Sequence, residues 1–185
     1  MTGDPVTPPP DRVSGAAPII VTATMGAADQ RFLDALRTAH FPPERNYLAA
    51  HITLFHQLPP SALAELEGLI RTIAADTIPP AARLIEVYSL GNGTAFRIDS
   101  PALLEIRARI AEHFAGMLTA QDRGTPKLHI TVQNKVTAKA AHALQTDLVR
   151  DFRPRPLIIA GLAAHHYRGG PWESASARNF RGPRR

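Results

Sequence analysis

The sequence of 185 residues contains no cysteine. This absence excludes disulfide bonds, thiolate nucleophiles and cysteine-based zinc or iron sites, so any catalysis must use histidine, carboxylate or hydroxyl groups. Long apolar runs are also missing, because charged residues or prolines interrupt every segment before it reaches the length of a membrane span. The first 18 residues have neither the basic nor the apolar region of a secretory signal. We therefore expect a cytoplasmic protein that does not bind membranes.

The chain carries a formal net charge of +5, which favours a phosphate-bearing partner. Part of this charge lies near the C-terminus, where four arginines stand among Ser, Gly and Pro, and a solvated tail explains them more simply than a dedicated RNA contact. The proline-rich residues 1–18 favour a disordered lead-in. We thus expect a disordered segment at 1–18, one folded domain at 19–172, and a basic flexible tail at 173–185.

Hydrophobic periodicity predicts strands and helices in alternation. Strands are expected at 19–24, 50–58, 83–90, 94–99, 127–134 and 157–167, and helices at 28–40, 61–76, 101–114 and 138–152. Ser61, Ser100 and Thr137 are expected to cap three of these helices, and Gly91-Asn92-Gly93 predicts a tight hairpin turn. A strand–helix pattern thus occurs twice around a central hairpin, which indicates a duplicated α+β fold with antiparallel sheets. Sequential parallel βαβ winding is the main alternative.

The strongest local signal is a motif that occurs twice, as His51-Ile52-Thr53-Leu54 and as His129-Ile130-Thr131-Val132. Because side chains alternate along a strand, each His shares a face with its Thr, and the apolar residues share the other face. Burial of the apolar faces would turn both His–Thr faces toward one open surface.

Two imidazoles on either side of a phosphorus atom can act as general base and general acid, since histidine titrates near neutral pH. The Thr hydroxyls can donate hydrogen bonds to the phosphate oxygens. For a single copy, a packed core histidine would be the simpler interpretation. Two copies with the same hydroxyl offset favour a catalytic site.

The duplicated motif resembles the signature of the two-histidine (2H) phosphoesterase superfamily, which includes 2'-5' RNA ligase-like proteins and RNA 2',3'-cyclic phosphodiesterases. The resemblance extends over residues 19–172 and implies two pseudo-symmetric lobes, each an antiparallel sheet backed by helices, with a central cleft between them. It implies that His51 and His129 are catalytic, that Thr53 and Thr131 bind phosphate, and that neither a metal nor another cofactor is needed. The substrate would be an RNA terminus or a small nucleotide with a cyclic phosphate, and we expect a monomer.

Other side chains are weaker candidates for substrate binding. Tyr88 and Phe96 can stack on a nucleobase or pack in the core, Trp172 can cover the cleft or anchor the tail, and Lys135 can reach a phosphate or simply face water. Three further histidines, His56, His165 and His166, raise the question of a zinc site, but no His-Glu-x-x-His pattern accompanies them.

Two alternatives to an enzyme remain open on the sequence alone. A module of the same fold can bind RNA or nucleotides without turnover. Both motifs can also be ordinary core strands, in which case the imidazoles would be buried far apart. Within the enzymatic interpretation, hydrolysis and ligation use the same groups, so the sequence does not separate the two directions.

Overall fold

The computed structural model describes residues 17–183, and every strand pair in it is antiparallel. The strands are β1 (Ile19–Met25), β2 (Ile52–Leu58), β3 (Ala81–Ser89), β4 (Thr94–Asp99), β5 (His129–Gln133), β6 (Arg155–His166) and β7 (Glu173–Asn179). The α-helices are α1 (Ala27–His40), α2 (Leu63–Asp76), α3 (Pro101–His113), α4 (Ala120–Arg123) and α5 (Ala138–Asp151). The segment expected to be disordered, residues 1–18, lies almost wholly outside the described residues.

Two four-stranded sheets share the long strand β6. Its C-terminal part pairs with β1 and β7, and β2 adds to β1. Its N-terminal part pairs with β3, which continues through β4 to β5. The sheet order β2-β1-β6-β3-β4-β5 therefore places the two motif strands, β2 and β5, at opposite ends of the path. This arrangement confirms the antiparallel, two-lobed α+β fold and excludes parallel winding.

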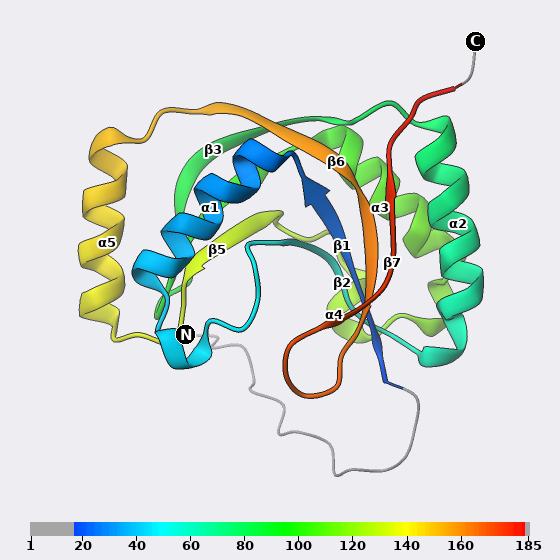
Figure 1. Ribbon diagram of the computed structural model, residues 1–185, viewed down its shortest axis with the longest axis horizontal. Helices are drawn as coiled ribbons and strands as arrows, with labels where there is room; N and C mark the ends of the chain where they lie inside the picture. The colour runs from blue at the N-terminus through cyan, green and yellow to red at the C-terminus, as the bar shows by residue number, and fades with distance from the viewer. Residues whose placement is uncertain (1–16, 184–185) are drawn as a thin grey trace.

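Helices cover one face of each sheet. In Figure 1, α5 lies at one side of the molecule, α2 and α3 lie at the other, and β6 arches over both halves. Helix α5 contacts β3 and β4, α1 contacts β5, and α2 contacts β6 and β7. The apolar residues of both motifs enter one continuous core, in which Ile52 and Ile130 have no exposed surface. Burial of this apolar surface is what turns the polar faces of β2 and β5 outward.

The helix caps are partly as the sequence predicts. The Ser100 hydroxyl accepts a hydrogen bond from the Leu103 amide, and the Thr137 hydroxyl accepts one from the Ala140 amide. Ser61 does not cap α2, because a 3-10 turn at Pro60–Ala62 precedes the helix and Ala62 takes the cap position without a side-chain bond.

The β3–β4 hairpin uses its two glycines for different reasons. Gly91 has a positive φ of 77°, as a tight turn requires. Gly93 instead lies against β5, where a Cβ atom would stand 2.4 Å from the Gln133 carbonyl oxygen. The first glycine thus makes the turn and the second allows the close approach of the next strand.

Residues 173–183 differ from the flexible tail that the sequence predicts. Residues 173–179 form β7 on the edge of β6, Phe180 is buried, and the Arg181 amide donates a hydrogen bond to the Ala74 carbonyl at 2.8 Å. Backbone pairing holds this segment in place although its own side chains are mostly small or polar. Among the described helices, none is long and apolar enough to cross a membrane.

Candidate active site

The two His–Thr motifs lie on edge strands that approach each other. His51 immediately precedes β2, His129 begins β5, and the two strands are in contact. Burial alternates in both copies, because each His and Thr is half-buried and the residues between and after them are buried. In each motif, His and Thr therefore share the more accessible face and the apolar residues share the buried face, as the sequence predicts.

Both imidazoles are held by the same local bond. The Nδ1 atom of His51 lies 2.8 Å from the Ala49 carbonyl oxygen, and Nδ1 of His129 lies 2.8 Å from the Lys127 carbonyl oxygen. A carbonyl can only accept, so Nδ1 must carry the proton in each ring. This tautomer leaves Nε2 of both histidines available to exchange a proton with a ligand.

The environment of His51 disfavours its charged form. Burial is the main reason that the pKa of His51 falls to about 4, and the charges of Arg37, His129 and His165 act in the same direction, against the opposing effect of the Ala49 carbonyl. At neutral pH the ring is therefore a neutral base. The effect of His129 on His51 also means that the two motif histidines lie within electrostatic reach of each other.

Cross-strand register identifies the neighbours of His129, because residues paired across two strands share a face. Arg97 of β4 pairs with His129. Ala95 of β4 pairs with Thr131 on one side and with Tyr88 of β3 on the other. Tyr88 therefore lies on the same face as His129 and Arg97. The Tyr88 and His129 ring centroids are 6.0 Å apart, and the Arg97 guanidinium lies 5.8 Å from the Tyr88 centroid. Tyr88 thus lies beside the imidazole of the second motif. Arg97 was missed, although hairpin alternation places it on this face.

Trp172 and His165 form the other side of the site. The Trp172 ring centroid lies 4.6 Å from that of His51 and 5.5 Å from that of His165. The Nε2 atom of His165 lies 3.0 Å from the Thr22 hydroxyl oxygen, and burial lowers the pKa of His165. A mostly apolar cavity of about 300 Å³ lies here, and its lining includes His51, Trp172, His165, Thr22, Thr24 and Tyr47. His165, Thr22 and Tyr47 carry no motif that the sequence analysis used.

Two expected contributors lie elsewhere. Phe96 is 2% exposed and lies in the core, where its ring centroid is 5.3 Å from that of Phe152. This position corrects the expectation that Phe96 offers a surface to a ligand. Lys135 is exposed in the turn after β5, with a left-handed φ of 60° that a hydrogen bond from its amide to the Asn134 side chain supports. The structure thus leaves Lys135 as a solvent-facing residue near the motif.

The additional histidines do not form a cluster. His56 pairs with the buried carboxylate of Asp122 at 3.0 Å, whereas His165 pairs with Thr22. Within residues 17–183, no group of three or more His, Asp or Glu side chains is placed to hold a metal ion.

Helix α1 fixes the residue before His51. The Asp34 carboxylate accepts a hydrogen bond from the Ala50 amide at 2.6 Å, and the Gln30 amide donates to the Ala50 carbonyl at 2.8 Å. Both main-chain groups of Ala50 are therefore tied to one helix face. This polar pair has i, i+4 spacing, a signal that was present in the sequence but is shared by many surface helices.

Comparisons with known proteins agree with this geometry. The 2'-5' RNA ligase superfamily matches residues 26–171. The fold is similar to that of TT0787 of Thermus thermophilus, with a TM-score of 0.58, 16% identity, and coverage of 89% of this chain and 98% of that chain. It is also similar to Escherichia coli LigT in complexes with NADP+ (TM-score 0.57, 15% identity, coverage 90% and 98%) and with 3'-AMP (TM-score 0.52, 14% identity, coverage 89% and 98%). No curated protein matches the sequence.

Proposed function

Because the chain belongs to the 2'-5' RNA ligase superfamily of two-histidine phosphoesterases, we propose that it hydrolyses, or reversibly forms, 2',3'-cyclic or 2'-5' phosphodiester bonds in RNA or nucleotides. The reaction is metal-independent and uses His51 and His129 as the acid–base pair. The observation that carries this proposal is the repeated geometry, in which each motif imidazole has its Nδ1 tied to the carbonyl two residues earlier and its Nε2 left for chemistry.

The two histidines take different roles in hydrolysis. Because its pKa is about 4, the His51 ring is neutral at neutral pH and can take a proton from the attacking water through Nε2, and the charge of a bound phosphate raises its basicity. The new bond joins the water oxygen to phosphorus, the bond from phosphorus to the ribose oxygen breaks, and His129 gives that oxygen a proton. His51 then releases the proton that it took to solvent, and His129 takes one back from solvent. When a hydroxyl group attacks phosphorus in place of water, the same steps join a cyclic end to that hydroxyl group, and the reverse of this joining re-forms the cyclic phosphate.

Thr53 and Thr131 bind the non-bridging oxygens of the phosphate. Each threonine lies on the same face as its motif histidine and is half-buried, so its hydroxyl is within reach of a phosphate bound between the two imidazoles. Hydrogen bonds that are already oriented toward the developing charge stabilise the transition state more than solvent does.

The nucleoside part of the substrate occupies the cavity beside His51. A volume of about 300 Å³ and an apolar lining with one indole and one phenol suit a nucleobase. Trp172 contributes one stacking surface, and Tyr88 borders the phosphate on the side of His129. The LigT structures with 3'-AMP and NADP+ agree with a nucleotide ligand for this fold.

A panel of substrates tests the proposal. Purified protein would be incubated with nucleoside 2',3'-cyclic monophosphates and with 2'-5' and 3'-5' dinucleotides in the presence of EDTA, and the products read by phosphorus NMR. We expect a single monoester regioisomer from at least one cyclic phosphate. Tight binding of an oligonucleotide without turnover of any substrate would contradict the proposal and favour a binding module.

A further inference from the structure

The two motif strands expose main-chain groups along their outer edges. Among residues 17–183, β2 and β5 end the sheet, so the outward carbonyls of each have no neighbouring strand in this part of the chain. Buried main-chain groups without partners are costly, and edge strands need other groups to cover them. Two buried arginines on different helices meet this need, Arg37 on α1 and Arg107 on α3, with 4% and 5% exposure.

Arg37 connects the second motif with the segment that leads into the first. Its Nη1 donates to the Thr131 carbonyl at 2.8 Å, inside the second motif, and its Nε donates to the Leu48 carbonyl at 3.1 Å, three residues before His51. Nη2 and Nε also donate to the side chain of Asn46 at 2.9 and 3.2 Å. One guanidinium therefore spans both halves of the site.

Arg107 makes the reciprocal connection. Its Nε donates to the Leu54 carbonyl at 3.2 Å, at the end of the first motif, and its Nη2 donates to the Asp122 carbonyl in the segment that precedes β5. Each arginine thus donates to a carbonyl of one motif and to a carbonyl in the segment that precedes the other motif.

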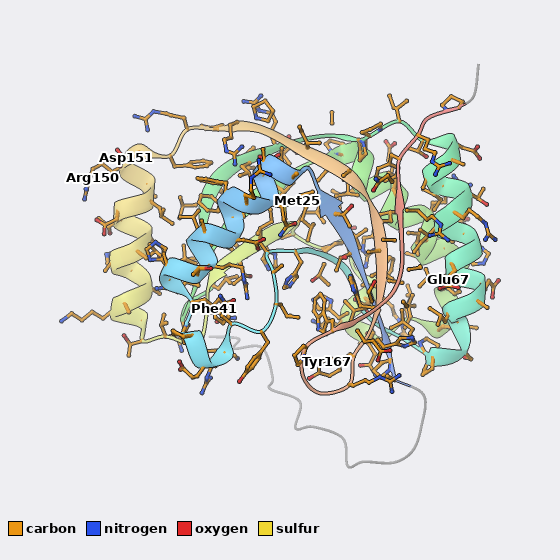
Figure 2. The ribbon with its side chains drawn as sticks, viewed as in Figure 1. Met25, Phe41, Glu67, Arg150, Asp151 and Tyr167 are labelled. Carbon is orange, nitrogen blue, oxygen red and sulfur yellow. The ribbon has the colours of Figure 1, made fainter. Side chains whose placement is uncertain are left out.

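The surroundings of the two guanidinium groups also match. Arg37 lies 4.3 Å from the Phe41 ring centroid, and Arg107 lies 4.6 Å from that of Phe55. Figure 2 shows Phe41 just beyond the C-terminal end of α1. Burial lowers the pKa of both arginines, and a nearby carboxylate, Asp34 or Asp122, opposes the shift. Burying two cations is expensive, and apolar residues of similar size would fill the space at lower cost.

We infer that Arg37 and Arg107 are a matched pair of positioning residues that set the distance between the two imidazoles, each by tying one motif strand to the segment leading into the other. The inference rests on the proposed function and deepens it. Neither arginine touches the reacting atoms. Their planar forks of N–H donors can bridge two carbonyls at once, which a lysine ammonium on a flexible stem does not reproduce.

Lysine variants test the inference because they keep the positive charge and lose the bridge. We expect R37K and R107K each to lower kcat for the best cyclic phosphate roughly 10- to 100-fold, since displacement of a catalytic group by about 1 Å has an effect of that order. The matched controls are R31K and R109K, which alter exposed arginines on the same two helices and should remain within about twofold of wild type. Thermal melting would confirm that each variant folds. Folded R37K and R107K with unchanged kcat would overturn the inference.

A second arm measures geometry without turnover. The His129 charge lowers the pKa of His51, so H129Q should raise that pKa in an NMR titration of the His51 ring. The rise should be smaller in the R37K background, because the rings would no longer be held at their native distance. An equal rise in both backgrounds would contradict the inference. If R37K does not fold, N46A offers a milder change, since it removes one acceptor of Arg37 and leaves the arginine in place.

The two arms separate the possible failures. A wild-type protein that turns over no cyclic phosphate would refute the proposed function, and the arginine inference would then stand or fall on the coupling between His51 and His129. An active wild type with no change in R37K and R107K would refute only the arginine inference.

Discussion

The indole of Trp172 packs against the imidazole of His51, with ring centroids 4.6 Å apart. Trp172 is the single tryptophan of the chain, and it follows the loop that begins at Tyr167, which Figure 2 labels. Intrinsic fluorescence therefore reports directly on the cavity beside His51. It also allows binding to be measured independently of catalysis.

We expect 3'-AMP to change the fluorescence of Trp172 and inorganic phosphate to change it less, because only the nucleotide places an aromatic base in the cavity. W172A should raise KM for a nucleoside cyclic phosphate about tenfold, as expected for the loss of one stacked base. W172F should keep most of the affinity, and Y167A on the same loop serves as a control. An unchanged KM in W172A would place the base elsewhere.

Replacement of either motif histidine should remove catalysis without unfolding the protein. H51A and H129A should each lower kcat about 100- to 10,000-fold, which is the usual contribution of a general acid or base. Both rings are half-buried on the polar face, so the melting temperature should change little. H142A, at an exposed position of α5, provides the control. Full activity in both motif variants would end the acid–base proposal.

The low pKa of His51 has a consequence for stability. The folded-state pKa is about 4, below the ordinary value of 6.5, so between these values the unfolded chain binds the proton more readily. The free energy of unfolding should therefore decrease as pH falls from about 6.5 to 4. Chemical denaturation at several pH values would show this loss, and H51Q should lose less stability than wild type over the same range.

A bound anion should reverse this effect. Phosphate next to the ring favours the imidazolium and raises the pKa of His51, which a titration of the ring by NMR with and without phosphate would detect. A pKa that does not move would indicate that phosphate binds away from His51.

Much of the fold was predictable because local patterns and tertiary packing agree. Ser100 and Thr137 cap helices whose apolar residues are spaced for burial, and the alternation in both motifs matches the faces of β2 and β5. The segment 173–179 shows the opposite case. Its order comes from pairing with β6, and the sequence Glu-Ser-Ala-Ser-Ala-Arg-Asn has no large or β-branched apolar residue to indicate a strand.

Part of the site was beyond prediction because it depends on register. Tyr88 pairs with Ala95 whereas Phe96 pairs with Val87, so the two aromatics face opposite sides of one sheet, and a shift of one residue would exchange them. Arg37 and Arg107 are a second case. Their spacing places Arg37 four residues after Leu33 and Arg107 four residues after Leu103, on the buried faces of their helices, but arginine is usually exposed, so residue type argued against burial.

The role of the threonines can be separated from their contribution to packing. T53V and T131V keep the shape of the side chain and remove the hydroxyl donor, and each should lower kcat about 100-fold, the scale of one lost donor to a developing oxyanion. T53S and T131S keep the donor and should retain most of the activity. T38V on the exposed side of α1 is a suitable control, because that hydroxyl bonds only within its own helix in the described part of the chain. If the valine variants keep their activity and the serine variants lose it, the methyl group rather than the hydroxyl matters, and the threonines support the strand instead of binding phosphate.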